Sequence, residues 1–379
     1  MITARLTLPL AALLLGAAPA VADIAIGGAA PLSGPNAALG EQLRRGAQMA
    51  VDDINATGGI RGERLALTMA DDGCDPRKAV DTATVFATEK VKAVIGHYCS
   101  GASIPASKVY EKAGILQISP ASTHPKLTDE GGWNVVRLVP RDDAEASAAA
   151  DLVLAKFAGK KIAIVNDQSP GFAALAARFR AGLQQKGVTP ALQESFKAGT
   201  KDLMPLSEKI RQSGAGVVYL AASYVESGLL ARGLRELGVS AQIVSGNSLV
   251  TEEFANQAGD AAEGTLMTFT YDPRKFPAAR SVVERLRADD KTAEGFNLYA
   301  YAAVQAFAAA AEATGGTEPA QLAEWLRGGN RFDTVVGPVA FDPKGDLKEP
   351  KIAWFRWIGG RYVEVDPATL QPPILDTTP

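Results

Sequence analysis

Small hydroxyl side chains follow two predicted strands of this chain, at the points where the strands end. The apolar residues 93–95 lead into a loop that contains Ser100, and the apolar residues 115–118 lead into the loop 119–123. In an open parallel sheet, a ligand binds outside the carboxyl ends of the strands. Hydroxyl groups there, with backbone N–H groups at the start of a following helix, can hold a carboxylate or another anion. The alternative is that Ser100 and Ser122 only cap helices, and the residue types alone do not decide.

Groups that could carry out catalysis are sparse. A serine hydrolase holds its nucleophile in a G-x-S-x-G turn, and the nearest match, residues 246–250, lacks the closing glycine. A histidine base would have to be His97 or His124, the two histidines of the chain. Three aspartates lack the spacing and closing glutamate of a calcium loop and are interpreted as a solvated strand end: Asp71, Asp72 and Asp75. We therefore predict a protein that is not an enzyme and has no cofactor or metal.

The two cysteines of the chain, Cys74 and Cys99, lie close together in the sequence. An even number of cysteines in an exported protein favours a disulfide. A metal-binding pair and a catalytic thiol are the alternatives. With only two histidines in the chain, a zinc site would be short of ligands.

The elements that must position these residues alternate between strands and helices. Apolar spacing predicts strands at 24–27, 65–69, 93–95 and 115–118, with helices at 37–54, 79–90 and 103–113 between and after them. The pattern restarts near residue 144 and continues to about residue 244. Such alternation is typical of βαβ units and a parallel sheet. A later helix, from Phe296 to Thr314, is apolar nearly all round and should be buried.

The first 22 residues have the pattern of a cleavable signal peptide. Arg5 precedes a short apolar run, and Ala20-Val21-Ala22 supplies the small residues that a signal peptidase requires. A membrane anchor is the alternative, but the apolar run is shorter than the roughly 20 residues that span a bilayer. We therefore expect a periplasmic protein whose mature chain begins at Asp23.

Composition bounds the remaining classes of function. The chain has 379 residues, which favours two domains over one. Its 47% hydrophobic and 21% charged residues are ordinary for a globular protein. A net charge of -3 without a basic cluster argues against nucleic-acid binding.

Several segments form a pattern when they are taken together: PLSGP at 31–35, DDINATGGI at 52–60, DDGCDP at 71–76, VIGHYCS at 94–100, SPAST at 119–123 and GPVAFDPKGDLK at 337–348. In combination they resemble the type I periplasmic binding proteins of ABC importers, specifically the leucine/isoleucine/valine-binding group. The resemblance covers nearly the whole mature chain and also supports a disulfide between Cys74 and Cys99.

The resemblance implies an α/β fold of two doubly wound parallel-sheet lobes joined by a three-segment hinge. Residues 23–141 and 272–348 would form the N-terminal lobe, and residues 142–271 and 349–379 the C-terminal lobe. It further implies capture of a branched-chain or other apolar amino acid by hinge closure. The closed protein, expected to be a monomer, would then dock on the membrane permease subunits of an ABC importer.

The resemblance also implies roles for particular residues. Ser100, Ala121 and Thr123 would hold the α-carboxylate of the ligand and part of its ammonium group. Leu39 and Phe296 correspond to positions at the side-chain pocket and suit an apolar ligand tail. The N-terminal lobe would contribute six ligand-binding residues: Leu39, Ser100, Ala121, Ser122, Thr123 and Phe296.

The second lobe departs from the pattern of the group. Phe172 would replace a tyrosine, displaced by one position, and Tyr224 is also shifted by one. Asn247 stands where the group has the carboxylate for the ammonium group. A neutral amide gives up the charge-assisted part of that hydrogen bond, roughly half its strength, unless Glu226 bends inward to compensate. Asn247 therefore keeps open an alternative ligand without an ammonium group, such as an aromatic carboxylate, an amide or a urea-like compound.

Overall fold

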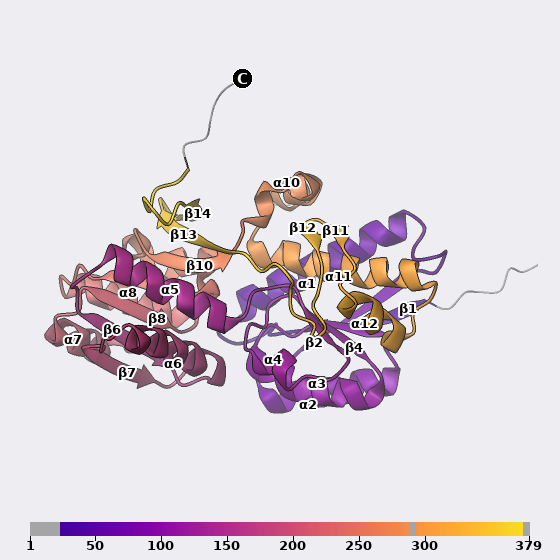
Figure 1. The fold of residues 1–379 in the computed structure, drawn as a ribbon, viewed down its shortest axis with the longest axis horizontal. Helices are drawn as coiled ribbons and strands as arrows, with labels where there is room; N and C mark the ends of the chain where they lie inside the picture. The colour runs from indigo at the N-terminus through magenta and orange to yellow at the C-terminus, as the bar shows by residue number, and fades with distance from the viewer. Residues whose placement is uncertain (1–22, 289–292, 374–379) are drawn as a thin grey trace, which may run out of the picture.

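The computed structural model describes residues 23–288 and 293–373, which form two α/β lobes lying side by side (Figure 1). The signal peptide predicted for residues 1–22 lies outside the described residues. Within these ranges, no helix is both long and apolar enough to cross a membrane.

The first lobe is built on a five-stranded parallel sheet with the strand order β2-β1-β3-β4-β5. Its strands are β1 (Ile24–Ala30), β2 (Leu65–Asp71), β3 (Ala93–Gly96), β4 (Leu116–Ser119) and β5 (Val135–Arg137). Helices α2 (Pro76–Glu89) and α3 (Ser100–Ala113) pack together over one face. Helices α1 (Ala37–Ala56), α11 (Gly295–Thr314) and α12 (Pro319–Arg327) cover the other. Because both faces are covered, β3 and β4 are buried along their whole length.

The second lobe has a seven-stranded sheet with the order β14-β13-β10-β9-β8-β6-β7. Strands β6 (Ile162–Asp167), β7 (Leu192–Phe196), β8 (Val217–Ala221), β9 (Gln242–Ser245) and β10 (Leu266–Thr270) are parallel. Strands β13 (Ile352–Ile358) and β14 (Arg361–Val365) add an antiparallel edge.

Helices cover both faces of the second sheet as well. Alternate residues of β6 point to opposite sides: Ile162 and Ile164 pack in one core with α5 (Asp142–Lys156) and α6 (Pro170–Gln185). Ala163 and Val165 pack in another core with α7 (Met204–Ser213), α8 (Tyr224–Glu236) and α9 (Glu252–Ala258).

The two lobes repeat one strand order. Counted from its own first strand, the parallel part of each sheet runs 2-1-3-4-5. In a sheet of this order, the switch point between the first and third strands is the place where ligands bind. The two sheets therefore have equivalent switch points. The loops at these points follow β1 and β3 in one lobe and β6 and β8 in the other.

The chain passes between the lobes in three segments, after β5, after β10 and before β13. The predicted boundaries at 141/142, 271/272 and 348/349 each fall between elements of different lobes and stay a prediction. The remaining elements are short: α4 (Lys126–Asp129), α10 (Arg280–Ala288), β11 (Phe332–Thr334), β12 (Gly337–Val339) and the 3₁₀ turns η1 (Asn247–Leu249), η2 (Gly259–Ala262), η3 (Pro273–Lys275) and η4 (Pro277–Ala279).

The predicted buried helix is α11, which begins one residue before Phe296. It packs along α1 so closely that a Cβ atom at Gly46 would lie 1.9 Å from the carbonyl oxygen of Asn297. Its first turn also reaches the second lobe, because Phe296 packs edge-on against Phe269 of β10 with ring centroids 5.2 Å apart. Helix α11 contacts a sheet, a helix and the other lobe, which accounts for its apolar residues on nearly every side.

Candidate functional site

A cavity of about 260 Å³ lies between the lobes at the carboxyl ends of both parallel sheets. The first lobe contributes the loops after β1, β2, β3 and β4, and the second contributes the start of α5 and the loops after β6, β7, β8 and β9. This position is where open parallel sheets bind ligands. The polar side chains in its lining belong to Asn36, Tyr98, Ser100, Thr123, Asp142, Asp167, Ser169, Ser223, Glu226 and Asn247.

The first-lobe wall presents hydrogen-bond donors. Ser100 is the first residue of α3, directly after the N-cap residue Cys99. The Oγ atom of Ser100 accepts a hydrogen bond from the backbone N–H of His124 at 3.2 Å, so its own hydrogen remains available for another acceptor. A Cβ atom at Gly101 would meet open space, which leaves room for an anion beside the first turn of the helix.

The loop after β4 supplies the rest of this wall. Ala121 and Thr123 line the cavity, as does Ser100. Ser122 is fully buried and does not, since its hydroxyl donates to the carbonyl oxygens of His97 at 3.1 Å and Tyr98 at 3.0 Å. Ser122 thus joins the loops after β3 and β4, and its predicted contact with a ligand stays a prediction.

A buried arginine fixes the shape of that loop. Arg137 has no exposed surface, and its Nη1 atom donates to the carbonyl oxygens of Ser122 at 3.2 Å and His124 at 2.9 Å. Its Nε atom donates to Asp346 Oδ1 at 2.6 Å. Burial lowers the pKa of Arg137, and the Asp346 carboxylate acts in the opposite direction. The Arg137 side chain therefore holds the loop after β4 to strand β5.

The second-lobe wall is acidic. Asp142, Asp167 and Glu226 line the cavity, and none of the described lining residues is a lysine, arginine or histidine. Burial raises the pKa of Asp142, although a hydrogen bond from Thr123 lowers it. Burial likewise raises the pKa of Asp167 against the hydrogen bonds from Ser169. Arg178 and Arg137 act on Asp142 from outside the lining. Because buried carboxyl groups are costly, a wall with three of them favours a ligand that brings positive charge.

Glu226 does face the cavity, as the prediction of its compensating role requires. It lies in the first turn of α8, where its Oε1 atom accepts a hydrogen bond from the backbone N–H of Gly199 at 2.7 Å. Its other carboxylate oxygen accepts a hydrogen bond from the Ser223 hydroxyl. Glu226 is therefore both a helix-start glutamate and part of the acidic wall.

Asn247 lines the cavity and is backed by an acid from another element. Its Nδ2 atom donates to Oε1 of Glu145 on α5 at 3.0 Å. Thr268 of β10 donates to the other oxygen of Glu145 at 3.2 Å. Burial raises the pKa of Glu145 to about 8, and Asp142 acts in the same direction. The acidic group that is absent at position 247 thus lies one side chain deeper.

The predicted apolar contacts divide into two groups. Phe172 lines the cavity together with Leu175. Leu39 is fully buried, Phe296 lies edge-on behind Tyr98 with centroids 5.2 Å apart, and neither lines the cavity. Tyr224 also lies outside the lining, and its oxygen accepts a hydrogen bond from the backbone N–H of Ala38 in the first lobe. Ligand contacts of Leu39, Tyr224 and Phe296 stay predictions.

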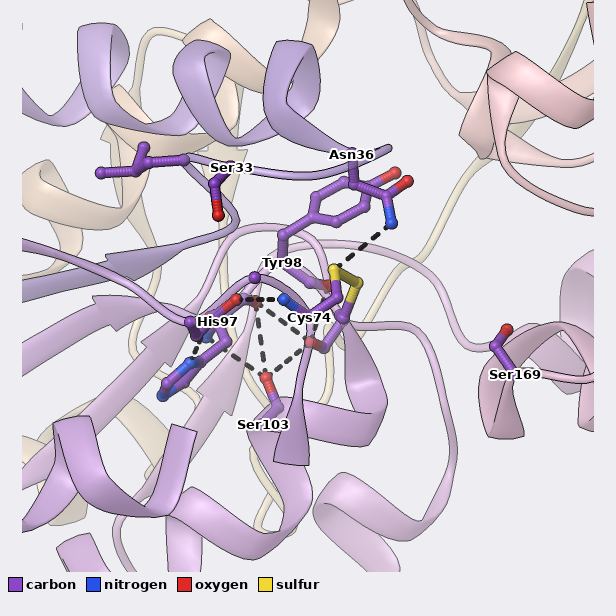
Figure 2. Close-up of a disulfide and its surroundings, with 12 residues drawn as sticks. Ser33, Asn36, Cys74, His97, Tyr98, Ser103 and Ser169 are labelled. Carbon is purple, nitrogen blue, oxygen red and sulfur yellow. Dashed lines mark hydrogen bonds and ion pairs between the residues drawn. A yellow bond between two sulfur atoms is a disulfide. The ribbon is translucent and has the colours of Figure 1, made fainter. Parts of the chain in front are cut away.

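Cys74 and Cys99 form the predicted disulfide, with Cα atoms 5.4 Å apart, and both line the cavity. The bond joins the loop after β2 to the residue before Ser100. The Nδ2 atom of Asn36 lies 3.5 Å from Cys74 Sγ. Figure 2 shows Ser169 of the second lobe across the cavity from the disulfide.

The solvated strand end predicted for residues 71–75 is wrong for Asp72. Asp72 and His97 are fully buried, and Asp72 Oδ2 lies 2.6 Å from His97 Nδ1. Nε2 of His97 lies 3.0 Å from the Tyr110 hydroxyl, and Asp72 Oδ1 accepts from the backbone N–H of Cys74 at 2.8 Å. The buried pair of His97 and Asp72 therefore helps to hold the loop that contains Cys74 in place.

Sequence reasoning missed several cavity residues, Tyr98, Asp142, Asp167 and Ser169 among them, and the acid Glu145 behind them. Tyr98 and Asp167 follow β3 and β6 closely, so the strand-end rule that selected Ser100 could have found them. Asp142 and Glu145 lie one helical turn apart in α5, at the start of a helix that follows a lobe crossing. Ser169, the residue directly before α6, lies three residues before Phe172 of that helix, and both line the cavity.

Similarity to known proteins agrees with this geometry. A family model described as periplasmic binding protein matches residues 23–361. The chain belongs to the periplasmic binding protein family. Its members bind substrates for transport, and the chain is not an enzyme.

Individual relatives are similar over almost their full length. The chain is 40% identical to Leu/Ile/Val-binding protein homolog 1 of Brucella melitensis, over 93% of this chain and 95% of that protein. It is 43% identical to an amino acid binding protein of Pseudomonas aeruginosa, over 89% of this chain and 91% of the relative. A solved structure, the branched-chain amino acid transporter substrate binding protein LivJ from Streptococcus pneumoniae in complex with isoleucine, superposes with a TM-score of 0.82. It is 26% identical and covers 90% of this chain and 100% of LivJ.

Proposed function

We propose that this periplasmic binding protein captures a branched-chain or other apolar amino acid for an ABC importer. The observation that carries the proposal is the polarity of the cavity between the lobes. Hydrogen-bond donors at Ser100 and the start of α3 form one wall, and Asp142, Asp167 and Glu226 stand on the other. An α-amino acid carries the complementary pair of charges on adjacent groups.

Each end of the ligand has a suitable partner in this arrangement. The free hydroxyl hydrogen of Ser100 would meet the carboxylate. Thr123, whose hydroxyl donates to Asp142, would contact the ligand between its carboxylate and its ammonium group. The ammonium group would face Asn247 and Asp142. Phe172, Leu175 and the ring of Tyr98 supply apolar surface for the side chain. The isoleucine bound by LivJ and the printed names of the curated relatives support the same ligand class.

The alternative is a ligand without an ammonium group, which the neutral side chain of Asn247 favours. An aromatic carboxylate would bring a negative charge toward Asp142, Asp167 and Glu226, with no cation among the described lining residues. Like charges in a buried site repel strongly. The acidic wall therefore supports an amino acid over a simple carboxylate.

Capture would proceed by hinge closure, for which periplasmic binding proteins are a standard example. A ligand that contacts both walls binds the closed form better than the open one, and so shifts the population toward closure. The closed monomer would then dock on the permease subunits of the importer. Export to the periplasm rests on the family and on the signal peptide predicted for residues 1–22.

Two measurements test the proposal. Native mass spectrometry of freshly purified protein, followed by mass spectrometry of the released small molecule, identifies a carried ligand. Isothermal titration of unfolded-and-refolded protein then compares leucine, isoleucine, valine, phenylalanine and alanine with 4-methylpentanoate, which is leucine without its ammonium group. We expect tight binding of at least one amino acid and weak binding of 4-methylpentanoate. Binding of 4-methylpentanoate alone would instead support the alternative ligand.

A further inference from the structure

The side chain of Asn247 has a defined orientation. Its Nδ2 atom donates to Oε1 of Glu145 at 3.0 Å, so the donor end of the amide faces the carboxyl group of Glu145. The carbonyl end, Oδ1, is therefore the end left for the cavity that Asn247 lines. Asn247 presents a hydrogen-bond acceptor where the ammonium group of an amino acid would lie.

Glu145 is held directly behind that amide. It is 1% exposed, and a Cβ atom at Gly246 would lie 3.5 Å from its Oε2 atom. It accepts hydrogen bonds from two neutral side chains, those of Asn247 and Thr268. A buried acid with neutral hydrogen-bond partners is costly to retain, and a cation in the cavity would offset that cost.

The charged and titratable groups that face Glu145 come from three elements. Asp142 lies one turn earlier on α5 and acts on Glu145 by charge repulsion. Tyr219 of β8 and Tyr98 from the loop after β3 both interact with Glu145 through their hydroxyl groups. These three groups are acids. The cations Arg178 and Arg137 act on Asp142 rather than on the Asn247 side of Glu145, where a ligand in the cavity would bring positive charge.

We propose that Glu145 is a positioning residue for the ammonium group of the ligand: it turns the Asn247 carbonyl oxygen toward the cavity and supplies, through that amide, the negative charge that position 247 lacks. The inference rests on the proposed function, because it requires a ligand with an ammonium group. It explains why an asparagine can stand at a position where an acid is expected. The hydrogen bond between Asn247 and an ionised Glu145 polarises the amide and strengthens its oxygen as an acceptor.

Proton linkage follows from this arrangement. In the free protein the pKa of Glu145 is raised to about 8, so near pH 7 the carboxyl group is mostly protonated. An ammonium group on the far side of Asn247 favours the ionised form and lowers that pKa. Binding near pH 7 should therefore release up to about one proton per ligand, and affinity should rise as the pH increases from about 6 to about 8.

The test uses the full mature protein with leucine as the probe. Titration calorimetry at pH 7 in phosphate and in Tris buffer measures the protons released, because the two buffers differ in ionisation enthalpy. We expect wild type to release protons. We expect Glu145→Gln to release fewer and to bind leucine about tenfold to a hundredfold more weakly, the range for loss of a hydrogen bond to a charged group.

A rescue separates recognition from structural support. Adding Asn247→Asp to Glu145→Gln moves the carboxylate forward to the cavity and should restore most of the leucine affinity. Asp151→Asn is the matched control, because Asp151 is an exposed acid on the same helix, paired with Lys186. It should change neither the affinity nor the proton release.

The outcomes are separable. If wild type binds neither leucine nor another amino acid, the proposed function fails. If wild type binds leucine without proton release and Glu145→Gln retains the affinity, the role of Glu145 is overturned while the function stands. If circular dichroism shows that Glu145→Gln does not fold, the proton release and pH profile of wild type decide alone.

Discussion

The disulfide between Cys74 and Cys99 allows the most quantitative prediction for stability. It closes a loop over a sequence separation of 25 residues. In the chain-entropy model, removing such a link stabilises the unfolded chain by about 3.5 kcal/mol at 25 °C. For a lobe of this size, each kcal/mol corresponds to roughly 2 to 4 °C, so the unfolding temperature of the first lobe should fall by roughly 7 to 14 °C.

The assay compares wild type with the double variant Cys74→Ser and Cys99→Ser by thermal unfolding, followed by circular dichroism. Treating wild type with a phosphine reductant should reproduce the variant, and the variant should not respond to the reductant. Because Cys99 is the N-cap residue of α3 and precedes Ser100, a saturating ligand should stabilise the variant less than wild type. An unfolding temperature within about 1 °C of wild type would refute the loop-entropy argument.

Three further predictions concern single side chains. Arg137→Met removes the buried partner of Asp346, which keeps its ion pair with Arg141, and the donor to the carbonyl oxygens of Ser122 and His124. It should lower the free energy of unfolding in urea by about 3 kcal/mol. Lys344→Met removes an exposed ion pair and should change that free energy by less than about 1 kcal/mol. Equal effects would contradict the argument from burial. Ser100→Ala should weaken leucine binding in calorimetry about tenfold to a hundredfold with little change in the unfolding midpoint, and an unchanged affinity would remove Ser100 from the site. Phe172→Ala should weaken binding of leucine about tenfold and of alanine much less, and a uniform loss would mean that Phe172 does not contact the ligand side chain.

Regular apolar patterns allowed much of the fold to be predicted from the sequence. Helix α11 was visible because it is apolar on every side, and β3 and β4 were visible as short apolar runs that end in loops. Two of the missed strands have weak local signals. Strand β5 has three residues and ends in a charge, and edge strand β7 alternates exposed polar residues with partly buried ones.

Residues of the candidate site could be predicted only where their position is determined by the strand or helix that they follow in the sequence. Ser100 and Thr123 follow strands directly, and the strand-end rule therefore brings them to the cavity. Glu145 could not be found in this way, because its role depends on α5 packing beside Asn247, which lies 102 residues later in the chain. The same holds for the contact between Arg137 and Asp346, which are 209 residues apart.

The shared strand order of the two lobes has a consequence for how ligand preference can change. Each lobe carries its own set of loops at the carboxyl end of its sheet, and the loops of one lobe are separate from the sheet of the other. In the proposed arrangement, the loops of the first lobe would face the carboxylate, and those of the second would face the ammonium group, whose presence distinguishes the two candidate ligand classes, together with part of the ligand side chain. Substitutions confined to the second lobe can therefore retune selectivity while general recognition of a carboxylate is inherited unchanged.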